Sequence, residues 1–253
     1  MSRSIFITGA GRRIGRALAV RFAREGWGVA VHYSSSEEKA RATYDEVRAL
    51  GVPASLVQAD VRDREAIREA IATGATELGG LDVLVNNAGV YPPATPIADV
   101  TEELWRQVIE TNLFGEFFAA QAAAEIMLRQ DTGADGLKGR IVNISSLGAF
   151  QIWKDRIPYN VSKAGVVQLT RALARSLAPH IAVNSVAPGA IEIPEEPVSG
   201  GMIAPSRIPM RRHGSVDDIF NAVRFFAETS SYITGETLIV DGGLNIAQET
   251  SQE

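Results

Sequence analysis

Short, continuous apolar runs alternate along the chain with longer stretches in which hydrophobic residues recur at helical spacing. Continuous apolar runs are typical of strands in a parallel sheet that is covered on both faces. Ile14, Leu18 and Phe22 illustrate the helical spacing, because they fall on one side of a helix. The expected strands are 4–8, 29–33, 54–59, 81–85, 140–144, 181–186 and 237–240. The expected helices are 14–25, 37–50, 63–78, 101–129 with a break near Gly115, 158–178 and 215–228.

Strand and helix alternate without a linker, an internal repeat or a low-complexity segment, which predicts a single α/β domain over residues 1–253. The parallel sheet is expected to be doubly wound, with helices on both faces. The segment 188–212 departs from the alternation, because it holds four prolines from Pro194 to Pro209 and the pair Gly200 and Gly201. This composition predicts a long loop over a site.

Composition excludes several classes of function. The chain has 253 residues, of which 45% are hydrophobic, and this is enough to form a core without metal or disulfide support. The net charge of −5 and the lack of a basic tract argue against nucleic-acid binding. The chain has no Cys, and His32, His180 and His213 are scattered, so no metal site is expected. Because the sequence shows no signal peptide and no long apolar run, we expect a cytoplasmic protein without a membrane partner.

A glycine-rich loop joins the first expected strand to the first expected helix. It reads TGAGRRIG over residues 8–15. Such a loop allows a tight turn, after which the N–H groups of the helix can meet a pyrophosphate. A plain strand-to-helix turn is the alternative, but the position of the loop favours dinucleotide binding.

The end of the second strand indicates which dinucleotide is bound. A carboxylate there would favour NAD by binding ribose hydroxyls, but this chain has Tyr33, Ser34 and Ser35. The loop adds the permanent charges of Arg12 and Arg13, and guanidinium groups suit phosphate geometry. We therefore expect NADP(H), with its 2′-phosphate held by arginine and serine side chains.

The stretch 146–163 contains a serine, a tyrosine and a lysine in the pattern S-x12-Y-x3-K. Tyr159 and Lys163 are four residues apart, so a helix places them on one face. A phenol normally titrates near pH ~10, and a nearby ammonium favours the phenolate. Ser146 could hold a carbonyl oxygen, so the three residues suit proton donation to a carbonyl. By itself the pattern is equally compatible with a surface pair.

Motifs along the whole chain favour a reaction centre over a surface pair for these residues. TGAGRRIG, ADV at 59–61, NNAG at 86–89, TNLFGEFF, NISS at 143–146, YNVSK, NSVAPGAI and VDGG follow one another between Ile5 and Gly243. In this order they resemble the short-chain dehydrogenase/reductase family. The resemblance implies a single-domain Rossmann fold with a seven-stranded sheet, a cytoplasmic oxidoreductase and a homotetramer. Its interfaces would use the helix 101–129 with the helix after Tyr159, and the last helix and strand.

The resemblance also implies roles for individual residues. Tyr159 would be the proton donor or acceptor, Lys163 would lower its pKa and bind the nicotinamide ribose, Ser146 would orient the carbonyl, and Asn112 would hold a water that links Lys163 to solvent. The implied cofactor-binding residues are Gly9, Arg12, Arg13, Ile14, Tyr33, Ser34, Ser35, Asp60, Val61, Asn87, Ala88, Gly89, Tyr159, Lys163, Pro188, Gly189 and Ile191. The substrate loop would span about 190–212, with Trp153 and Tyr91 nearby.

Three positions are decisive within the family. Arg13 stands where the loop usually has its second glycine, and this resembles pteridine reductases, as do HYSSSE and LAPHIAVNSVAPG. Ser146 stands where many pteridine reductases carry Asp, and it restores the pattern of 3-oxoacyl-carrier-protein reductases. Ile193 replaces the usual Thr of PGxIxT, whose hydroxyl would contact the carboxamide.

Three functions are therefore compared. The leading hypothesis is an NADPH-dependent reductase of a small-molecule carbonyl, a 3-oxoacyl group or a similar ketone, that transfers hydride with a tyrosine as proton donor. The alternative enzyme is a pteridine or dihydropterin reductase. The alternative of another class is a catalytically silent NADP-binding sensor or scaffold.

Overall fold

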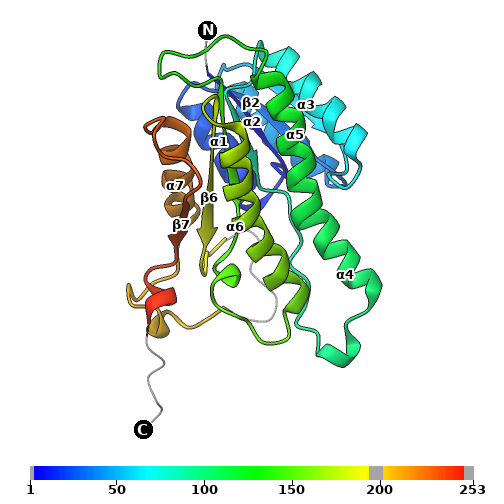
Figure 1. Ribbon diagram of the computed structural model, residues 1–253, viewed down its shortest axis with the longest axis vertical. Coiled ribbons are helices and arrows are strands. Elements are labelled where there is room, and N and C mark those ends of the chain that lie inside the picture. Colours follow the sequence, from blue (N-terminus) through cyan, green and yellow to red (C-terminus); the bar gives the residue numbers. More distant parts are fainter. Residues whose placement is uncertain (1–2, 194–201, 248–253) are drawn as a thin grey trace.

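The computed structural model describes residues 3–193 and 202–247 of the chain (Figure 1). One sheet of seven parallel strands runs through the molecule in the order β3-β2-β1-β4-β5-β6-β7. The strands are β1 Ser4–Ile7, β2 Gly28–Tyr33, β3 Ala54–Gln58, β4 Val83–Asn86, β5 Gly139–Ile144, β6 Ile181–Pro188 and β7 Thr237–Val240. The predicted doubly wound sheet of seven strands is confirmed.

Helices cover both faces of this sheet (Figure 1). The helices are α1 Arg13–Arg24, α2 Glu37–Ala49, α3 Arg64–Leu78, α4 Glu102–Ile109, α5 Gly115–Met127, α6 Ile157–Leu177 and α7 Val216–Glu228. Those on one face, α1, α2 and α7, bury the first core cluster, in which Phe22 meets Trp27 and Phe220 edge to face. Those on the other face, α3, α5 and α6, bury the second cluster. Within the described ranges, no helix is long and apolar enough to cross a bilayer.

The predicted helix 101–129 is divided where a break was expected. A π-helical turn, Glu110–Phe114, separates α4 from α5, and α5 begins at Gly115. A Cβ on Gly115 would lie 2.7 Å from Cγ2 of Val61, so only glycine lets the helix pass this close to the segment after β3. The extra residue of the π turn re-aims the side chains that follow, among them Glu116.

The fourth strand begins two residues later than the sequence pattern predicts. Leu81 N–H donates to Oε1 of Gln130 at 2.7 Å, and the side-chain amide of Gln130 returns a bond of 2.9 Å to the Leu81 carbonyl. The side chain of Gln130 therefore satisfies the backbone N–H and carbonyl of Leu81, and strand pairing between β1 and β4 starts at Val83.

The strand order fixes where a site can form. β1 pairs with β2 on one side and with β4 on the other, so the crossovers leave in opposite directions from β1. In such sheets ligands bind at the carboxyl ends of the strands beside this switch point. The glycine loop follows β1, NNAG includes the end of β4, and Ser146 follows β5.

Candidate functional site

The glycine loop and the NNAG segment form one hydrogen-bonded unit. Oγ1 of Thr8 accepts bonds of 2.9 Å from the backbone N–H groups of Asn87 and Ala88. The side-chain amide of Asn87 donates to the carbonyl oxygens of Thr8 and Gly9, at 2.9 and 3.2 Å. The sequence-predicted residues Gly9, Asn87 and Ala88 therefore lie together, and the Asn87 amide serves the loop backbone.

His32, on β2, hydrogen-bonds to the glycine loop and to the segment after β3. Its Nδ1 accepts from the Gly9 N–H at 3.1 Å, and its Nε2 lies 3.1 Å from the carbonyl oxygen of Ala59. Nε2 carries the hydrogen, because Nδ1 is the acceptor. Burial lowers the pKa of His32 from 6.5 to about 4. Sequence reasoning treated His32 as a surface or packing residue, and the structure shows it fully buried beneath the loop.

The glycines of the loop lie too close to neighbouring atoms to be replaced by residues with side chains. Gly9 has a left-handed φ of 65°, and a Cβ on Gly15 would overlap the carbonyl oxygen of Gly9. The residue before α1, Arg12, makes no side-chain cap hydrogen bond, so its side chain leaves the N–H groups of the first turn to another acceptor. Backbone donors at a helix N-terminus behind a glycine turn fit a dinucleotide pyrophosphate.

Arg13 has a left-handed backbone, with φ at 52°. A residue with a Cβ adopts this left-handed conformation at a cost of about 1–2 kcal/mol, which glycine avoids. The finding explains why the family usually has glycine at this position, and it shows that Arg13 keeps its side chain at a conformational cost. Strain of this kind is found mostly at functional sites.

The ends of β1 and β2 bring the candidate phosphate-binding residues to one edge. Ala10 N–H donates to the His32 carbonyl at 2.8 Å, which joins the loop to the end of β2. Ser34 and Ser35 follow β2 and are exposed, as is Arg12, whereas the side chain of Tyr33 belongs to the core. The hydroxyls and Arg12 can thus meet a ligand directly, and Tyr33 shapes the site from below.

At the end of β3, Asp60 is held by its neighbour Arg62. The guanidinium reaches both carboxylate oxygens at 2.6 to 3.1 Å. This hydrogen bonding lowers the pKa of Asp60. Val61 is buried against Gly115. Asp60 and Val61, which the family resemblance implies flank the adenine of the cofactor, are therefore one fixed carboxylate and one packing residue.

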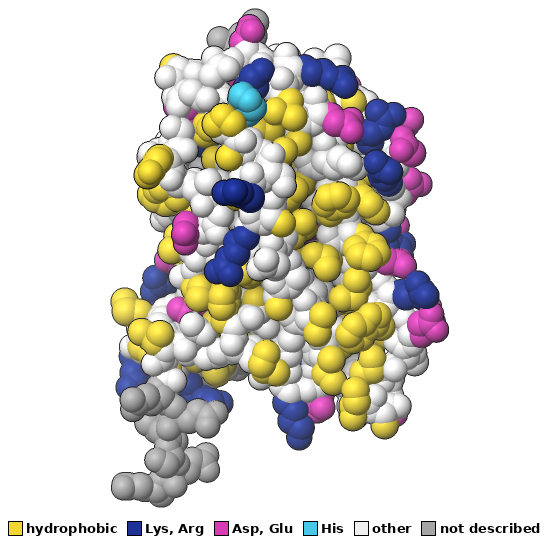
Figure 2. Space-filling view, viewed as in Figure 1, with side chains coloured by type: hydrophobic (Ala, Val, Ile, Leu, Met, Phe, Trp, Pro, Cys, Tyr) yellow, Lys and Arg dark blue, Asp and Glu magenta, His cyan; other side chains and the backbone are white. Residues whose placement is uncertain are grey.

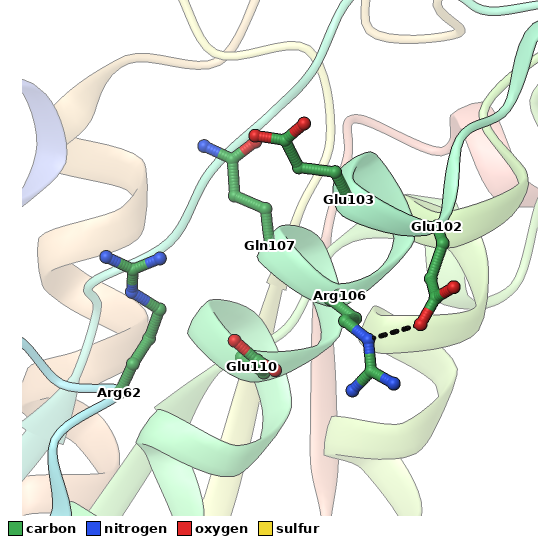
Figure 3. A pocket seen from close by; sticks show the side chains of 6 residues that line it. All are labelled: Arg62, Glu102, Glu103, Arg106, Gln107 and Glu110. Carbon is green, nitrogen blue, oxygen red and sulfur yellow. Dashed lines mark hydrogen bonds and ion pairs between the residues drawn. The ribbon is translucent and has the colours of Figure 1, made fainter.

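A polar hollow of about 520 Å³ lies beside this end, between Arg62 and the helix α4 (Figure 3). Three carboxylates, two guanidinium groups and one amide surround it, and Arg106 pairs with Glu102 at 2.7 Å. Its lining is Arg62, Glu102, Glu103, Arg106, Gln107 and Glu110. None of the candidate catalytic side chains borders it, so it is distinct from the reaction site.

Ser146 and Tyr159 come together through Gly148. Oγ of Ser146 accepts from the Gly148 N–H at 3.1 Å, and a Cβ on Gly148 would lie 3.2 Å from Cε1 of Tyr159. The turn that carries Ser146 thus packs on the tyrosine ring. Ser145 points elsewhere, because its Oγ donates to the backbone carbonyl of Lys163 at 3.0 Å. The geometry supports the choice of Ser146 that the spacing indicated.

Lys163 has a buried carboxylate as its partner. Its Nζ donates to the Ile144 carbonyl at 2.7 Å and to Oε1 of Glu116 at 3.2 Å. Burial raises the pKa of Glu116 to about 7, although the charge of Lys163 opposes the rise. Sequence reasoning did not single out Glu116. Its signal is the acid of TNLFGEFF, one helical turn after Asn112.

Asn112 lies in the same wall but bonds to other groups. Its side chain accepts from the Val90 N–H at 2.8 Å and donates to the Val90 carbonyl at 3.0 Å and to Oγ of Ser162 at 3.1 Å. A Cβ on Gly89 would lie 3.2 Å from Oδ1 of Asn112 and 3.8 Å from Nζ of Lys163. Asn112, Gly89 and Lys163 therefore share one surface of the site.

Aromatic rings surround Tyr159. The Tyr91 ring stands edge-on at 4.8 Å between centroids, and Trp153 stacks nearly parallel at 5.9 Å. The guanidinium carbon of Arg156 lies 4.2 Å from the centroid of Tyr91. Tyr91 and Trp153, which were expected near the substrate loop, both contact the ring of Tyr159, and Arg156 is an addition that the sequence did not reveal.

The segment after β6 carries the last group of expected cofactor-binding residues, and it packs against the segment after β7. Gly189 N–H donates to the Val240 carbonyl at 2.9 Å, and a Cβ there would lie 2.7 Å from Cα of Asp241. Ile191 bridges to Gly214 and is buried. Ile193, which replaces the usual Thr, is 5% exposed. Residues 194–201 of the expected substrate loop lie outside the described part of the chain.

Comparison with known proteins agrees with this geometry. Residues 9–245 match the family described as enoyl-(acyl carrier protein) reductase. The chain is 40% identical over 251 residues to the 3-oxoacyl-[acyl-carrier-protein] reductase FabG of Staphylococcus aureus, an alignment that covers 96% of this chain and 98% of that protein.

Two solved structures share the fold. Acetoin dehydrogenase from Enterobacter cloacae has a TM-score of 0.88 and 33% identity, with 100% of this chain and 99% of that chain covered. An NAD⁺-bound xylitol dehydrogenase has a TM-score of 0.85 and 29% identity, with 95% and 98% covered. Fold and site define a Rossmann-type oxidoreductase of the class that uses a nicotinamide cofactor. The chain belongs to the short-chain dehydrogenase/reductase family.

Proposed function

We propose that this chain is an NADPH-dependent reductase of a small-molecule carbonyl, a 3-oxoacyl thioester or a similar ketone. The observation that supports it most is the packing of the Ser146 turn on the Tyr159 ring, one helical turn from Lys163. The likeness to a 3-oxoacyl-carrier-protein reductase over 96% of the chain supports the substrate class.

Each residue has a chemical task in this proposal. A nicotinamide cofactor held at this site would supply the hydride that the carbonyl carbon receives. The hydroxyl of Ser146 orients and polarises the carbonyl oxygen, and Oη of Tyr159 donates the proton that the oxygen needs. The ammonium of Lys163 stabilises the phenolate that remains. Tyr91 and Trp153, whose rings contact that of Tyr159, would form the apolar side of the substrate position.

The cofactor is proposed to lie along the carboxyl ends of the strands, from β3 to β6. Arg12, Arg13, Ser34 and Ser35 would hold the 2′-phosphate, and the first turn of α1 at Ile14 would hold the pyrophosphate. The remaining contacts would follow the family order at Asp60, Val61, Asn87, Ala88, Gly89, Pro188, Gly189 and Ile191. The whole chain, 1–253, would form this single NADP-binding domain, with its substrate loop at about 190–212.

The test is NADPH oxidation with a 3-oxoacyl thioester, in the wild type and in Tyr159→Phe. We expect the variant to lose about 10³-fold in turnover, within the range for removal of a general acid, while NADPH binding followed by fluorescence titration stays within about twofold of wild type. Turnover that survives in Tyr159→Phe would contradict the mechanism. A wild type that binds NADPH but reduces no carbonyl would support the sensor or scaffold instead.

A second enzyme is favoured by one observation. Arg13 keeps its side chain beside the cofactor loop at the cost of a left-handed backbone, and this resembles pteridine reductases. In this alternative the arginine contacts a dihydropterin as well as the cofactor phosphate. Parallel assays with a 3-oxoacyl thioester and a dihydropterin at equal NADPH separate the two, because the preferred substrate should show the higher kcat/KM.

The chain is also proposed to form a homotetramer. Hydrophobic side chains gather along the face of α4 and α5 in Figure 2. Phe114 and Phe117 are 50% and 40% exposed, and both contact the partly buried Phe118. Exposed aromatic rings that cluster on one helix are typical of protein interfaces. From the sequence, core packing is the expectation for both Phe117 and Phe118; Phe118 packs against the second core cluster, whereas Phe117 is exposed.

A further inference from the structure

We propose that Glu116 is a positioning residue for the reaction: its carboxyl group holds the Lys163 ammonium and stores the proton that Lys163 returns to Tyr159 after each reduction. The inference deepens the proposed function and rests on it for the role of Tyr159. It adds a buried acid that the sequence pattern did not predict.

The contact is direct and almost completely shielded from water. Glu116 is 3% exposed and Lys163 is 5% exposed, and Oε1 of the acid lies 3.2 Å from Nζ of the lysine. The Ile144 carbonyl takes a second hydrogen of the ammonium at 2.7 Å. An ammonium has three hydrogens, so one remains for the phenol or for a ligand. The acceptor oxygen Oε1 thus fixes the direction of the remaining N–H.

The surroundings of the second carboxyl oxygen indicate that Glu116 is readily protonated, because within the described ranges this oxygen makes no hydrogen bond that would hold it as part of the structure. Oε2 of Glu116 is buried and has no hydrogen-bond partner among the described residues. A buried charged oxygen without a partner is costly, whereas a protonated carboxyl group avoids most of that cost. The neutral acid is therefore a readily populated state of this side chain.

Within the described part of the chain, Lys163 is the one charged group that opposes protonation of Glu116. The adjacent strands contribute amides: Nδ2 of Asn86 bonds to the Glu116 backbone carbonyl at 3.0 Å and to Oδ1 of Asn143 at 3.0 Å. The π turn contributes the amide of Asn112, and the charged side chains of α3 are all exposed. Lys163 on α6 is the charged partner of the buried acid, and burial raises the pKa of Glu116 to about 7.

The proton balance closes on these groups. Reduction breaks the C=O π bond and forms one C–H bond from the hydride, with its two electrons, and one O–H bond from the Tyr159 proton. The phenolate then takes a proton from Nζ of Lys163, and Nζ takes one from the carboxyl group of Glu116. Solvent reprotonates Glu116, so one proton is consumed per carbonyl. Alcohol oxidation runs through the same groups in reverse.

This balance predicts opposite pH dependences for the two directions. Reduction needs Glu116 protonated, so kcat should fall as pH rises above about 7, and oxidation needs it ionised, so kcat should rise. Glu116→Gln keeps the size and the acceptor oxygen but cannot titrate. We expect it to lose the pH dependence near 7 in both directions and about tenfold of kcat at neutral pH, a typical share of a proton-transfer contribution, with little change in KM for NADPH.

A second readout needs neither cofactor nor turnover. The pKa of Glu116 is raised from an ordinary 4.5 to about 7 in the folded state, so its stabilising contribution is present below pH 4.5 and is lost as pH rises through 7. The Tm of the wild type without ligand should therefore fall relative to that of Glu116→Gln between pH 4.5 and 7, and the difference should level off above 7. Glu116→Asp, which keeps the acid, should retain both pH dependences.

Glu125→Gln is the matched control, because Glu125 lies on the same helix and is exposed. It should behave as wild type in both experiments. A Glu116→Gln variant with the wild-type pH profile of kcat, or with a Tm difference that does not change with pH, would overturn the inference. Failure of the proposed function would show differently, as turnover that persists in Tyr159→Phe while the Tm titration of Glu116 is unchanged.

Discussion

The backbone N–H of Gly9 donates to Nδ1 of His32, and the opposite nitrogen of the ring bonds to the carbonyl of Ala59, both at 3.1 Å. A neutral imidazole satisfies both groups, because it accepts at one nitrogen and donates at the other. A second proton on the ring would face the Gly9 N–H. The shape of the glycine loop therefore depends on an uncharged histidine.

This dependence predicts a stability change in acid. Burial lowers the pKa of His32 from 6.5 to about 4, so the unfolded chain binds more protons between these values and stability rises with pH there. The contribution of His32 is present above pH 6.5 and is lost as pH falls through 4, by about 3 kcal/mol in total. Urea unfolding of the wild type and His32→Leu at several pH values measures it.

The difference between the two proteins is the relevant quantity, because Glu116 titrates in the same range with the opposite sign. At pH 7 His32→Leu should be less stable, since it leaves the Gly9 and Ala59 groups without their partner. The gap should shrink as pH falls from 6.5 to 4. His180→Gln, at an exposed histidine, is the control, and a gap that does not vary with pH would refute the prediction.

Arg13 should lower the stability of the fold and raise the preference for NADPH over NADH. Arg13→Gly removes the left-handed strain at φ 52° and should raise the free energy of unfolding by about 1 kcal/mol. It also removes a cation from the proposed phosphate site, so KM for NADPH should rise about tenfold, the equivalent of one charge-assisted hydrogen bond, while KM for NADH stays similar. Steady-state kinetics with both cofactors measures the preference. Arg13→Lys keeps charge and strain, and it should change neither quantity much.

The two adjacent serines should separate stability from catalysis. Ser145 donates a buried hydrogen bond to the carbonyl of Lys163, so Ser145→Ala should lose about 1 kcal/mol of stability and keep most of its turnover. Ser146→Ala should keep its Tm within a few degrees and lose about 10²-fold in kcat, as expected for removal of an orienting hydroxyl. Thermal unfolding and kinetics of both variants test this. The reverse outcome would move the catalytic serine by one residue.

The exposed phenylalanines should control assembly. If α5 lies in an interface, the double variant Phe114→Ser with Phe117→Ser should lower the solution mass from four times the 27.1 kDa of one chain toward smaller species. Light scattering measures the mass. Leu50→Ser changes a similarly exposed apolar residue, which directly follows α2 on the other side of the sheet, and it should leave the mass unchanged. A wild type that is already a monomer would contradict the proposed tetramer.

Local pattern was sufficient for most of the architecture. Apolar runs and helical spacing predict all seven strands and the helices between them, because burial on two faces demands continuous hydrophobic segments. The same reasoning places the glycine loop after β1 and Tyr159 with Lys163 on one helix face. It chooses Ser146 over Ser145 by spacing, and the hydrogen bonds support that choice. These features depend on neighbours in the chain, so the sequence alone determines them.

Other features depend on which side chains meet across the fold. The pairing of Glu116 with Lys163 joins residues that are 47 positions apart and lie on two different helices, α5 and α6. His32 acquires its role because β1, β2 and β3 lie side by side at one edge. The sequence by itself determined the fold and the family, and it indicated the tyrosine on which the proposed reaction depends. Only the tertiary structure decided which buried groups hold and tune them, since burial and pairing arise when distant segments pack together.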